Sequence, residues 1–306
     1  MGKKTKVGYL VVKDYIVVTG GAGFVGSNLI KQMVYKTKFQ IISIDNYTTG
    51  KKKNHIKDKR VRYINNHTKN IFKILQPYKN KIKTIFHFGE FARIYQSFSH
   101  INDCIDSNTI GTQAVFNYCL KNKVKLIYSA TSASLGNKGK DLNLSPYAFT
   151  KAKNLEILEN FKSWFNLKYE IIYFYNVYGP GQICTGNMAT VIGIFENQYK
   201  NKKPLTVVKP GSQSRKFTHI NDTIDACFFA WKKNKCKHYS ISYKKDYTVL
   251  EVAKMFNSKI KFLPARAGER NTSSLISMKL SNKIFKIFGK INLKSYIKSI
   301  MKNNKI

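Results

Sequence analysis

The sequence predicts an α/β fold, with a Rossmann-type doubly wound parallel sheet and a smaller C-terminal α/β lobe. Three observations predict it. Apolar strand-like runs alternate with helical stretches through the first half, a glycine-rich turn follows the first run, and the alternation loosens beyond about residue 180. Strands that alternate with helices form right-handed crossovers and a parallel sheet. We therefore expect one domain over residues 1–180 and a lobe mainly over 181–306, with some segments returning to the main sheet.

The expected elements follow from short apolar runs and from helical periodicity. Strands are expected at 15–20, 40–45, 83–89, 124–130 and 169–180. Helices are expected after the glycines at 23–36, between two strands at 108–122, and in the second half at 248–256.

The composition is that of a globular protein, since 43% of the 306 residues are hydrophobic and only 6 are proline. No run of about 18 apolar residues is present, so no membrane insertion is expected. Lys13 and Asp14 also interrupt the apolar N-terminal stretch, which is too short for a secretory core. The cysteines are five and widely spaced, so we expect no disulfide framework, no metal site and a reducing, cytoplasmic location.

The formal net charge is +38, which is typical of proteins that bind nucleic acids or anionic membranes. Only 6 of the 54 basic residues are arginine, leaving 54 − 6 = 48 lysines spread over the whole length. That distribution favours coding bias, and a nucleic-acid partner is not expected. A polyanion-binding surface is the alternative, and its densest candidate segments are 48–60 and 231–238.

The glycine-rich turn reads Gly21-x-Gly23-x-x-Gly26, follows a predicted strand and opens a predicted helix. Asp45 ends the next strand at the distance typical of dinucleotide-binding proteins. An aspartate there accepts the ribose hydroxyls and repels a 2′-phosphate, which favours NAD over NADP. Asp45 has an alternative role as a turn-capping residue. The expected cofactor-binding residues here are Gly20, Gly23, Phe24, Val25, Gly26, Asp45 and Asn46.

Tyr147 and Lys151 are the candidate catalytic pair. The spacing alone is weak, because Tyr9/Lys13, Tyr47/Lys51 and Tyr199/Lys203 share it. Ser145 and Pro146, however, suit the N-cap and first position of a helix, on which residues four apart share one face. Positive charge from the lysine and from an oxidised nicotinamide makes a phenol an effective base. The alternative is an exposed tyrosine and a solvated lysine.

Taken in order, several motifs resemble those of the extended short-chain dehydrogenase/reductases that act on nucleotide sugars, the NAD-dependent epimerase/dehydratase group. The resemblance covers roughly residues 14–275. Its motifs are TGGAGFVG, DNYTTG, IFHFGE, NTIGT, SATSASLG, SPYAFTK, NVYGPGQ, GNMATVI, GSQSRKFTHINDTIDA and PARAGE. The resemblance implies an NAD-binding domain at 1–180 and a substrate-binding lobe at 181–306.

The resemblance implies that Tyr147 is the base, that Lys151 is its electrostatic partner and ribose ligand, and that Thr131 contacts the reacting sugar hydroxyl. Further cofactor-binding residues are Asn66, Phe88, Gly89 and Asn108. Substrate-binding residues are Asn176, Asn187, Met188, Arg215 and Arg266. The implied reaction is C4 epimerisation of a UDP-hexose through a transient 4-keto intermediate, by a homodimer.

Four departures from the family pattern concern the substrate and the surroundings of the site. Ser132 and Ala133 stand where sugar 4,6-dehydratases carry Asp-Glu, which argues against dehydration. Glu90 appears in HFGE where HLAA is commoner, Lys216 replaces an aspartate, and the segment from 136 to 147 is short. The alternatives are a nucleotide-sugar 4-reductase or dehydrogenase and, more distantly, a non-catalytic protein that binds RNA or another polyanion.

Overall fold

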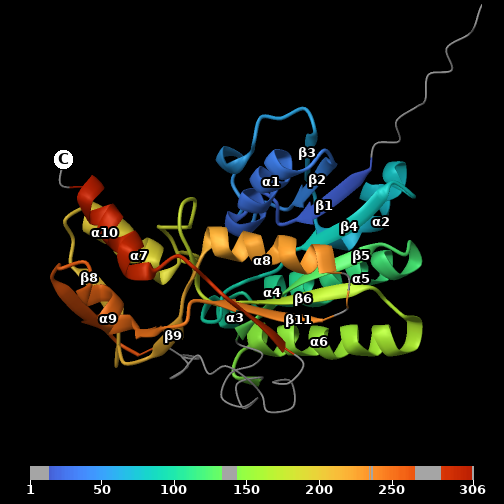
Figure 1. The fold of residues 1–306 in the computed structure, drawn as a ribbon. Coiled ribbons are helices and arrows are strands. Elements are labelled where there is room, and N and C mark those ends of the chain that lie inside the picture. The colour runs from blue at the N-terminus through green and yellow to red at the C-terminus, as the bar shows by residue number, and fades with distance from the viewer. Residues whose placement is uncertain (1–13, 133–142, 234, 236, 266–283, 305–306) are drawn as a thin grey trace, which may run out of the picture.

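The computed structural model describes residues 14–132, 143–233, 235, 237–265 and 284–304. Its centre is an eight-stranded parallel sheet, ordered β14-β11-β6-β5-β4-β1-β2-β3 (Figure 1). These strands are β1 (Tyr15–Thr19), β2 (Gln40–Asp45), β3 (Val61–Asn65), β4 (Ile82–His87), β5 (Lys125–Thr131), β6 (Tyr169–Phe174), β11 (His238–Ser242) and β14 (Ile284–Phe288). The strand order reverses at β1 and β4, as in a doubly wound fold.

Helices cover both faces of this sheet, because neighbouring residues of a strand point to opposite sides. In β1, Ile16 and Val18 pack with α1 (Phe24–Lys36) and α8 (Ile220–Lys233). Val17 packs in the opposite cluster. That second cluster includes α2 (Ile71–Leu75), α5 (Thr112–Lys121) and α6 (Pro146–Phe165), and Figure 1 shows α6 and α8 on opposite sides.

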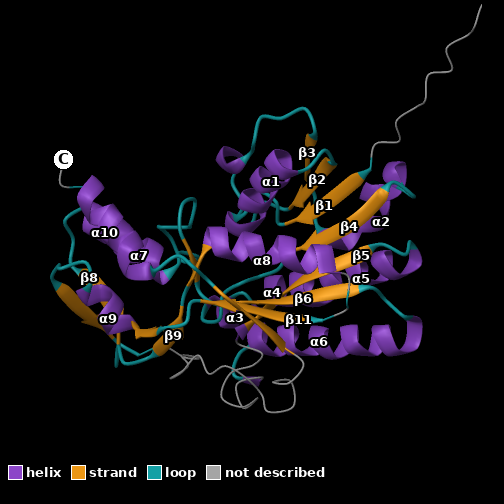
Figure 2. Ribbon diagram, viewed as in Figure 1, coloured by secondary structure: helices purple, strands orange, loops and turns teal. Residues whose placement is uncertain are grey.

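A smaller lobe lies at the left of Figure 2. It has an apolar cluster of its own. It contains α7 (Val191–Lys200), β8 (Leu205–Val208), α9 (Val249–Lys254), β13 (Ile260–Leu263) and α10 (Leu293–Asn303). A capping box of Thr248 and Glu251 begins α9. Two short strand pairs connect the lobe to the main body: β7 (Val177–Tyr178) with β10 (Thr218–His219), and β9 (Ser214–Lys216) with β12 (Asp246–Thr248).

The predicted fold class is confirmed, and so are its first strands and the helix at α1. The expected strand at 169–180 is divided, because β6 ends at Phe174 and Asn176 takes a left-handed φ of 31°. The helix expected at 108–122 begins within a π-helical segment, η4 (Asp106–Gly111), and continues as α5. Two short helices, α3 (Gln96–Ser99) and α4 (Ile101–Ile105), precede it. The sequence reasoning did not find β3, α8, β11 or β14. The last three follow residue 181 yet belong to the main sheet and its cover; the domain division itself stays a prediction.

Candidate active site

The glycine-rich turn lies between β1 and α1, where only glycine fits. Gly20 has a φ of +70°, and a Cβ there would lie 2.8 Å from the carbonyl carbon of Phe88. A Cβ on Gly26 would lie 2.2 Å from the carbonyl oxygen of Gly20. The helix α1 begins after Gly23 without a side-chain cap. The backbone N–H groups at the start of α1 therefore lack a side-chain partner, and the glycines let a ligand come close to them. This arrangement suits the diphosphate of a dinucleotide.

Asp45, the last residue of β2, is buried against this turn. Its Oδ2 accepts a hydrogen bond of 2.9 Å from the amide of Ala22, and its Oδ1 accepts one of 2.8 Å from that of Tyr47. Burial raises the pKa of Asp45, while backbone hydrogen bonds from Tyr47, Ala22 and Gly23 oppose that rise. The turn-capping alternative therefore describes part of its role. Each carboxylate oxygen has a second lone pair with which to accept a ribose hydroxyl.

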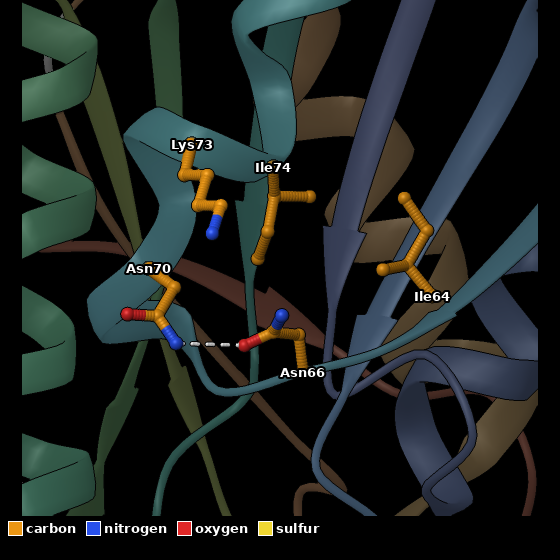
Figure 3. Close-up of a pocket in the computed structure, with 5 residues that line it drawn as sticks. All are labelled: Ile64, Asn66, Asn70, Lys73 and Ile74. Atoms are coloured by element: carbon orange, nitrogen blue, oxygen red, sulfur yellow. Dashed lines mark hydrogen bonds between the residues drawn. The ribbon is translucent and has the colours of Figure 1, made fainter.

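Two hollows meet at Asn66, just beyond the end of β3. The larger has a volume of about 370 Å³ and is lined by Ile64, Asn66, Asn70, Lys73 and Ile74 (Figure 3). In it Asn70 Nδ2 donates to Asn66 Oδ1 over 2.8 Å. The smaller, of about 20 Å³, is lined by Gly20, Ile44, Asp45, Asn46, Asn66, His67, Thr68 and Gly89. Five predicted cofactor residues thus surround one hollow at the carboxyl ends of the strands, the usual binding edge of such a sheet. His67 and Thr68 were missed because β3 itself was not predicted.

Tyr147 and Lys151 lie on one face of α6, as their spacing predicted. Ser145 is the N-cap, and its Oγ accepts a hydrogen bond of 3.1 Å from the amide of Ala148. Tyr147 and Lys151 are only 9% and 4% exposed. Tyr147 packs in a small apolar cluster with Phe91, Cys104, Ala148 and Met188. The alternative of an exposed tyrosine and a solvated lysine is therefore wrong.

The ammonium group of Lys151 is fixed by three groups. Its Nζ donates to the carbonyl oxygen of Ser129 over 2.6 Å and lies 4.8 Å from the centre of the Tyr128 ring. It also forms a buried ion pair with Glu90. Ser129 belongs to β5, which ends at Thr131, so the three predicted catalytic residues lie on two adjoining elements.

Glu90 follows Gly89 at the end of β4, and sequence reasoning assigned it no role. Its Oε1 accepts hydrogen bonds from the hydroxyls of Tyr128 and Thr112, at 3.0 and 3.2 Å. Burial raises the pKa of Glu90, and the neighbouring Lys151 opposes that rise. The acidic residue in HFGE was visible, but only the fold shows which lysine it meets.

His87, the last residue of β4, is linked to Glu90 through Thr112. Its ring nitrogens are 2.7 Å from Thr19 Oγ1 and 2.9 Å from Thr112 Oγ1. Burial lowers the pKa of His87 to about 3, with Lys151 adding to that effect. The ring is therefore neutral at ordinary pH, and it joins the strand before the glycine-rich turn to the surroundings of Glu90.

Asn108 uses its amide to hold the chain just beyond Glu90. Its Oδ1 accepts from the amide of Phe91 over 2.7 Å, and its Nδ2 donates to the carbonyl of Phe91 over 3.1 Å. It lies in the π-helical segment η4, a local widening of the helix that is frequent at functional sites. Asn108 therefore fixes the chain at Phe91, which is two residues beyond Gly89, a predicted cofactor residue.

The predicted substrate residues fall into two groups. Met188 lies against Tyr147, and its carbonyl accepts a 2.9 Å hydrogen bond from Arg93 Nε. Gln96 holds the carbonyl of Asn187. Arg93 and Gln96 were missed, since neither stands out in the sequence.

The second group lies at β9, in the connection to the smaller lobe. Asn176 Nδ2 donates to the carbonyl of Lys216 over 2.8 Å, next to the buried Arg215. Lys216, which departs from the family pattern, pairs with Asp246 at 2.7 Å. Arg266 lies outside the described residues, as do Ala133 and the first part of the shortened segment.

Comparison with known proteins agrees with this geometry. Residues 16–242 match the sequence model of the NAD dependent epimerase/dehydratase family. An uncharacterised UDP-glucose epimerase of Bacillus subtilis is 27% identical, over 68% of this chain and 70% of that protein. A putative UDP-glucose 4-epimerase of Methanocaldococcus jannaschii is also 27% identical, over 71% and 74%. The crystal structure of UDP-glucose 4-epimerase from Thermotoga maritima, with UDP-glucose, has a TM-score of 0.83 at 22% identity, covering 95% of this chain and 98% of that one.

Proposed function

The chain belongs to the NAD dependent epimerase/dehydratase family, and from that premise we propose that it epimerises C4 of a UDP-hexose through a transient 4-keto sugar. Its cofactor is NAD, as the family description states. The observation that carries the proposal is the placement of Tyr147 and Lys151, which are buried on one face of α6 and joined to the end of β5. Through Glu90 this pair is next to the glycine-rich turn, because Gly89 lies against Gly20.

The protein's part in the reaction is acid–base chemistry and orientation. NAD, when bound, would supply the acceptor and donor of the C4 hydride, and the glycine-rich turn and Asp45 would hold it. Tyr147 takes the proton of the 4-hydroxyl and later gives it back, so neither proton nor hydride is consumed. Lys151 stabilises the phenolate form of Tyr147, which is the form that accepts this proton. The hydroxyl of Thr131 holds the substrate oxygen in line with Tyr147.

Epimerisation also requires a keto sugar that turns without leaving the site. We assign retention of the nucleotide diphosphate to Arg215 and Arg266. A guanidinium group binds phosphate oxygens with two parallel hydrogen bonds, which a lysine cannot do. Both are among only six arginines in a chain that has 48 lysines.

The test is to incubate the purified chain and NAD with UDP-glucose, UDP-N-acetylglucosamine and UDP-glucuronate in turn. Sugar products are resolved by chromatography while absorbance reports free NADH. We expect a 4-epimer of one donor with no accumulated NADH. A net change in NADH, or a released keto sugar, would replace the epimerase with the reductase or dehydrogenase alternative.

A binder of RNA without catalysis has no use for a buried Tyr147 and Lys151 held beside a dinucleotide turn, so the nucleotide sugar remains the proposed partner.

We propose a cytoplasmic location, on the evidence of the cysteines: Cys104, Cys119 and Cys227 are buried as free thiols. None of the described helices is long and apolar enough to cross a membrane.

We also propose a homodimer, formed through the helices next to the active site. Ile101 and Ile105 of α4, Ile110 of η4 and Phe149 of α6 are large apolar side chains with exposed fractions of 50%, 37%, 53% and 44%. Neighbouring apolar residues exposed on adjoining helices are typical of a face covered by a partner. A second copy of this chain, presenting the same face, is the partner that a twofold dimer supplies.

A further inference from the structure

We infer that Glu90 is a positioning residue, which holds Lys151 through a buried ion pair and offsets part of its charge beside Tyr147. The inference rests on the proposed function, because it assigns Tyr147 and Lys151 their roles. It concerns a position at which this chain departs from the commoner HLAA pattern.

The first argument is burial. The side chains of Lys151 and Glu90 are only 5% and 2% exposed, so water screens their interaction weakly. A buried ammonium without a counter-ion is costly, and Glu90 is the carboxylate that this lysine reaches. With Ser129 accepting a second hydrogen bond from the same Nζ, the end of the lysine side chain has one defined position.

The second argument is that Glu90 is itself held in place. Tyr128 from β5 and Thr112 from α5 donate to its Oε1. Asn154 from α6 adds a longer contact of 3.4 Å to the same oxygen. Asn108 holds the backbone of Phe91, the next residue. The carboxylate therefore cannot leave Lys151 without breaking contacts to three elements, which distinguishes this pair from a mobile surface ion pair.

The third argument is the charge of the groups that surround the pair. The titratable groups facing it are His87 of β4, Cys104 of α4, Tyr128 of β5 and Tyr147 of α6. Burial lowers the pKa of His87 to about 3 and raises those of Cys104 and Tyr128, so these three groups are neutral at ordinary pH. The charge of Arg93 acts on Tyr147 from the side of Met188.

Two measurable consequences follow from the negative charge of Glu90. It counteracts the cations that stabilise the phenolate of Tyr147, so removing it lets Tyr147 act as a base at lower pH. It also favours the positively charged nicotinamide of NAD⁺ over the neutral one of NADH, so removing it shifts cofactor preference toward NADH.

The experiment compares Glu90→Gln with Glu170→Gln in the full chain. Glu170 is a matched control, because it is completely buried and lies 3.6 Å from Lys125 in the same sheet, on β6. We expect Glu90→Gln to move the acidic limb of the kcat/KM profile about one unit toward lower pH. The ratio of the Kd for NADH to that for NAD⁺ should fall by about threefold or more. Glu170→Gln should change stability and leave both readouts unmoved.

A Glu90→Gln protein whose pH profile and cofactor preference match the wild type would overturn the inference, even if its melting temperature or rate changed. If that variant does not fold, Glu90→Ala replaces it, since alanine is the commoner residue of the family pattern at this place, and the same two results decide. The cofactor affinities need no turnover. A wild-type chain inactive on every donor would thus count against the proposed function, while the affinity ratio would still decide the role of Glu90.

Discussion

At the scale of single residues, the site depends on side chains whose charge is set by burial. Lys151, Glu90 and His87 are all buried, and they differ in their partners. Lys151 and Glu90 form an ion pair, whereas the ring of His87 has two hydroxyl partners and burial lowers its pKa. Tyr147 lies on the same face of α6 as Lys151, and its hydroxyl is the group on which the proposed chemistry depends.

Tyr147→Phe removes that hydroxyl and little else. We expect turnover to fall by at least about a thousandfold, because a positioned acid–base group contributes two to four orders of magnitude. NAD affinity should stay within about twofold, which is measured by calorimetric titration. Tyr35→Phe, which changes a tyrosine that is 85% exposed near the end of α1, is the control. Full activity in Tyr147→Phe would refute the proposed mechanism.

His87 gives a prediction about stability. Its folded pKa, about 3, lies below the ordinary value of 6.5. Between these values the unfolded chain takes up a proton that the folded chain does not, so stability is fully present above about pH 6.5 and is lost as the pH falls toward 3. The loss is about 1.4 kcal/mol for each pH unit.

Urea unfolding at pH 6.5, 5.5 and 4.5 measures this dependence. In His87→Gln the side-chain amide can bond Thr19 or Thr112 and cannot titrate. The free energy of unfolding of this variant should therefore fall less steeply with pH than that of the wild type, by about 1.4 kcal/mol for each pH unit. Parallel slopes for the two proteins would show that His87 is not the group responsible.

At the scale of elements, function depends on where helices begin. The α1 helix begins at a glycine turn without a side-chain cap, whereas α6 begins with Ser145 and Pro146. The first arrangement leaves backbone donors for a ligand, and the second fixes the start of the helix so that Tyr147 and Lys151 have a defined direction.

Gly26→Ala tests the turn. The new methyl group would lie 2.2 Å from the carbonyl oxygen of Gly20, which is backbone and must move. We expect NAD affinity to fall at least tenfold, or about 1.4 kcal/mol, measured by titration of the folded protein. Ser27→Ala, at the next position of α1, should bind NAD as the wild type does. Equal affinity in all three proteins would exclude the turn as the diphosphate site.

At the scale of the whole molecule, the apolar face of α4, η4 and α6 would connect the proposed dimer to the proposed chemistry, because α6 carries both part of this face and Tyr147. A partner covering Phe149 would steady the same turns of the helix that hold the catalytic pair. The smaller lobe is connected to the main body by other elements, the short strand pairs of β7 with β10 and of β9 with β12.

Ile101→Lys combined with Phe149→Lys should convert the proposed dimer to a monomer, because two charges on an apolar face that a partner covers are costly to bury. Sedimentation velocity at micromolar concentration measures the change. Tyr35→Lys is the control, since Tyr35 is 85% exposed at the end of α1. A wild-type chain that sediments as a monomer would remove the proposal.

Local sequence patterns are enough to predict the parallel sheet, the glycine-rich turn, Asp45 and the helix that carries Tyr147 and Lys151. These features are local: periodicity, glycine spacing and capping residues act over a few neighbouring positions. Segments with weaker patterns were missed. In β3 no residue is fully buried, and β14 alternates little, so neither gives a clear strand pattern.

Which side chains meet depends instead on how segments that are distant in sequence pack together. Glu90 and Lys151 are far apart in sequence, and their pairing depends on β4, β5 and α6 packing together. The same holds for Arg93 with Met188 and for Asn176 with Lys216. A chain with 48 lysines offers each carboxylate many candidate partners. Burial and distance, which the fold alone sets, select the one that binds.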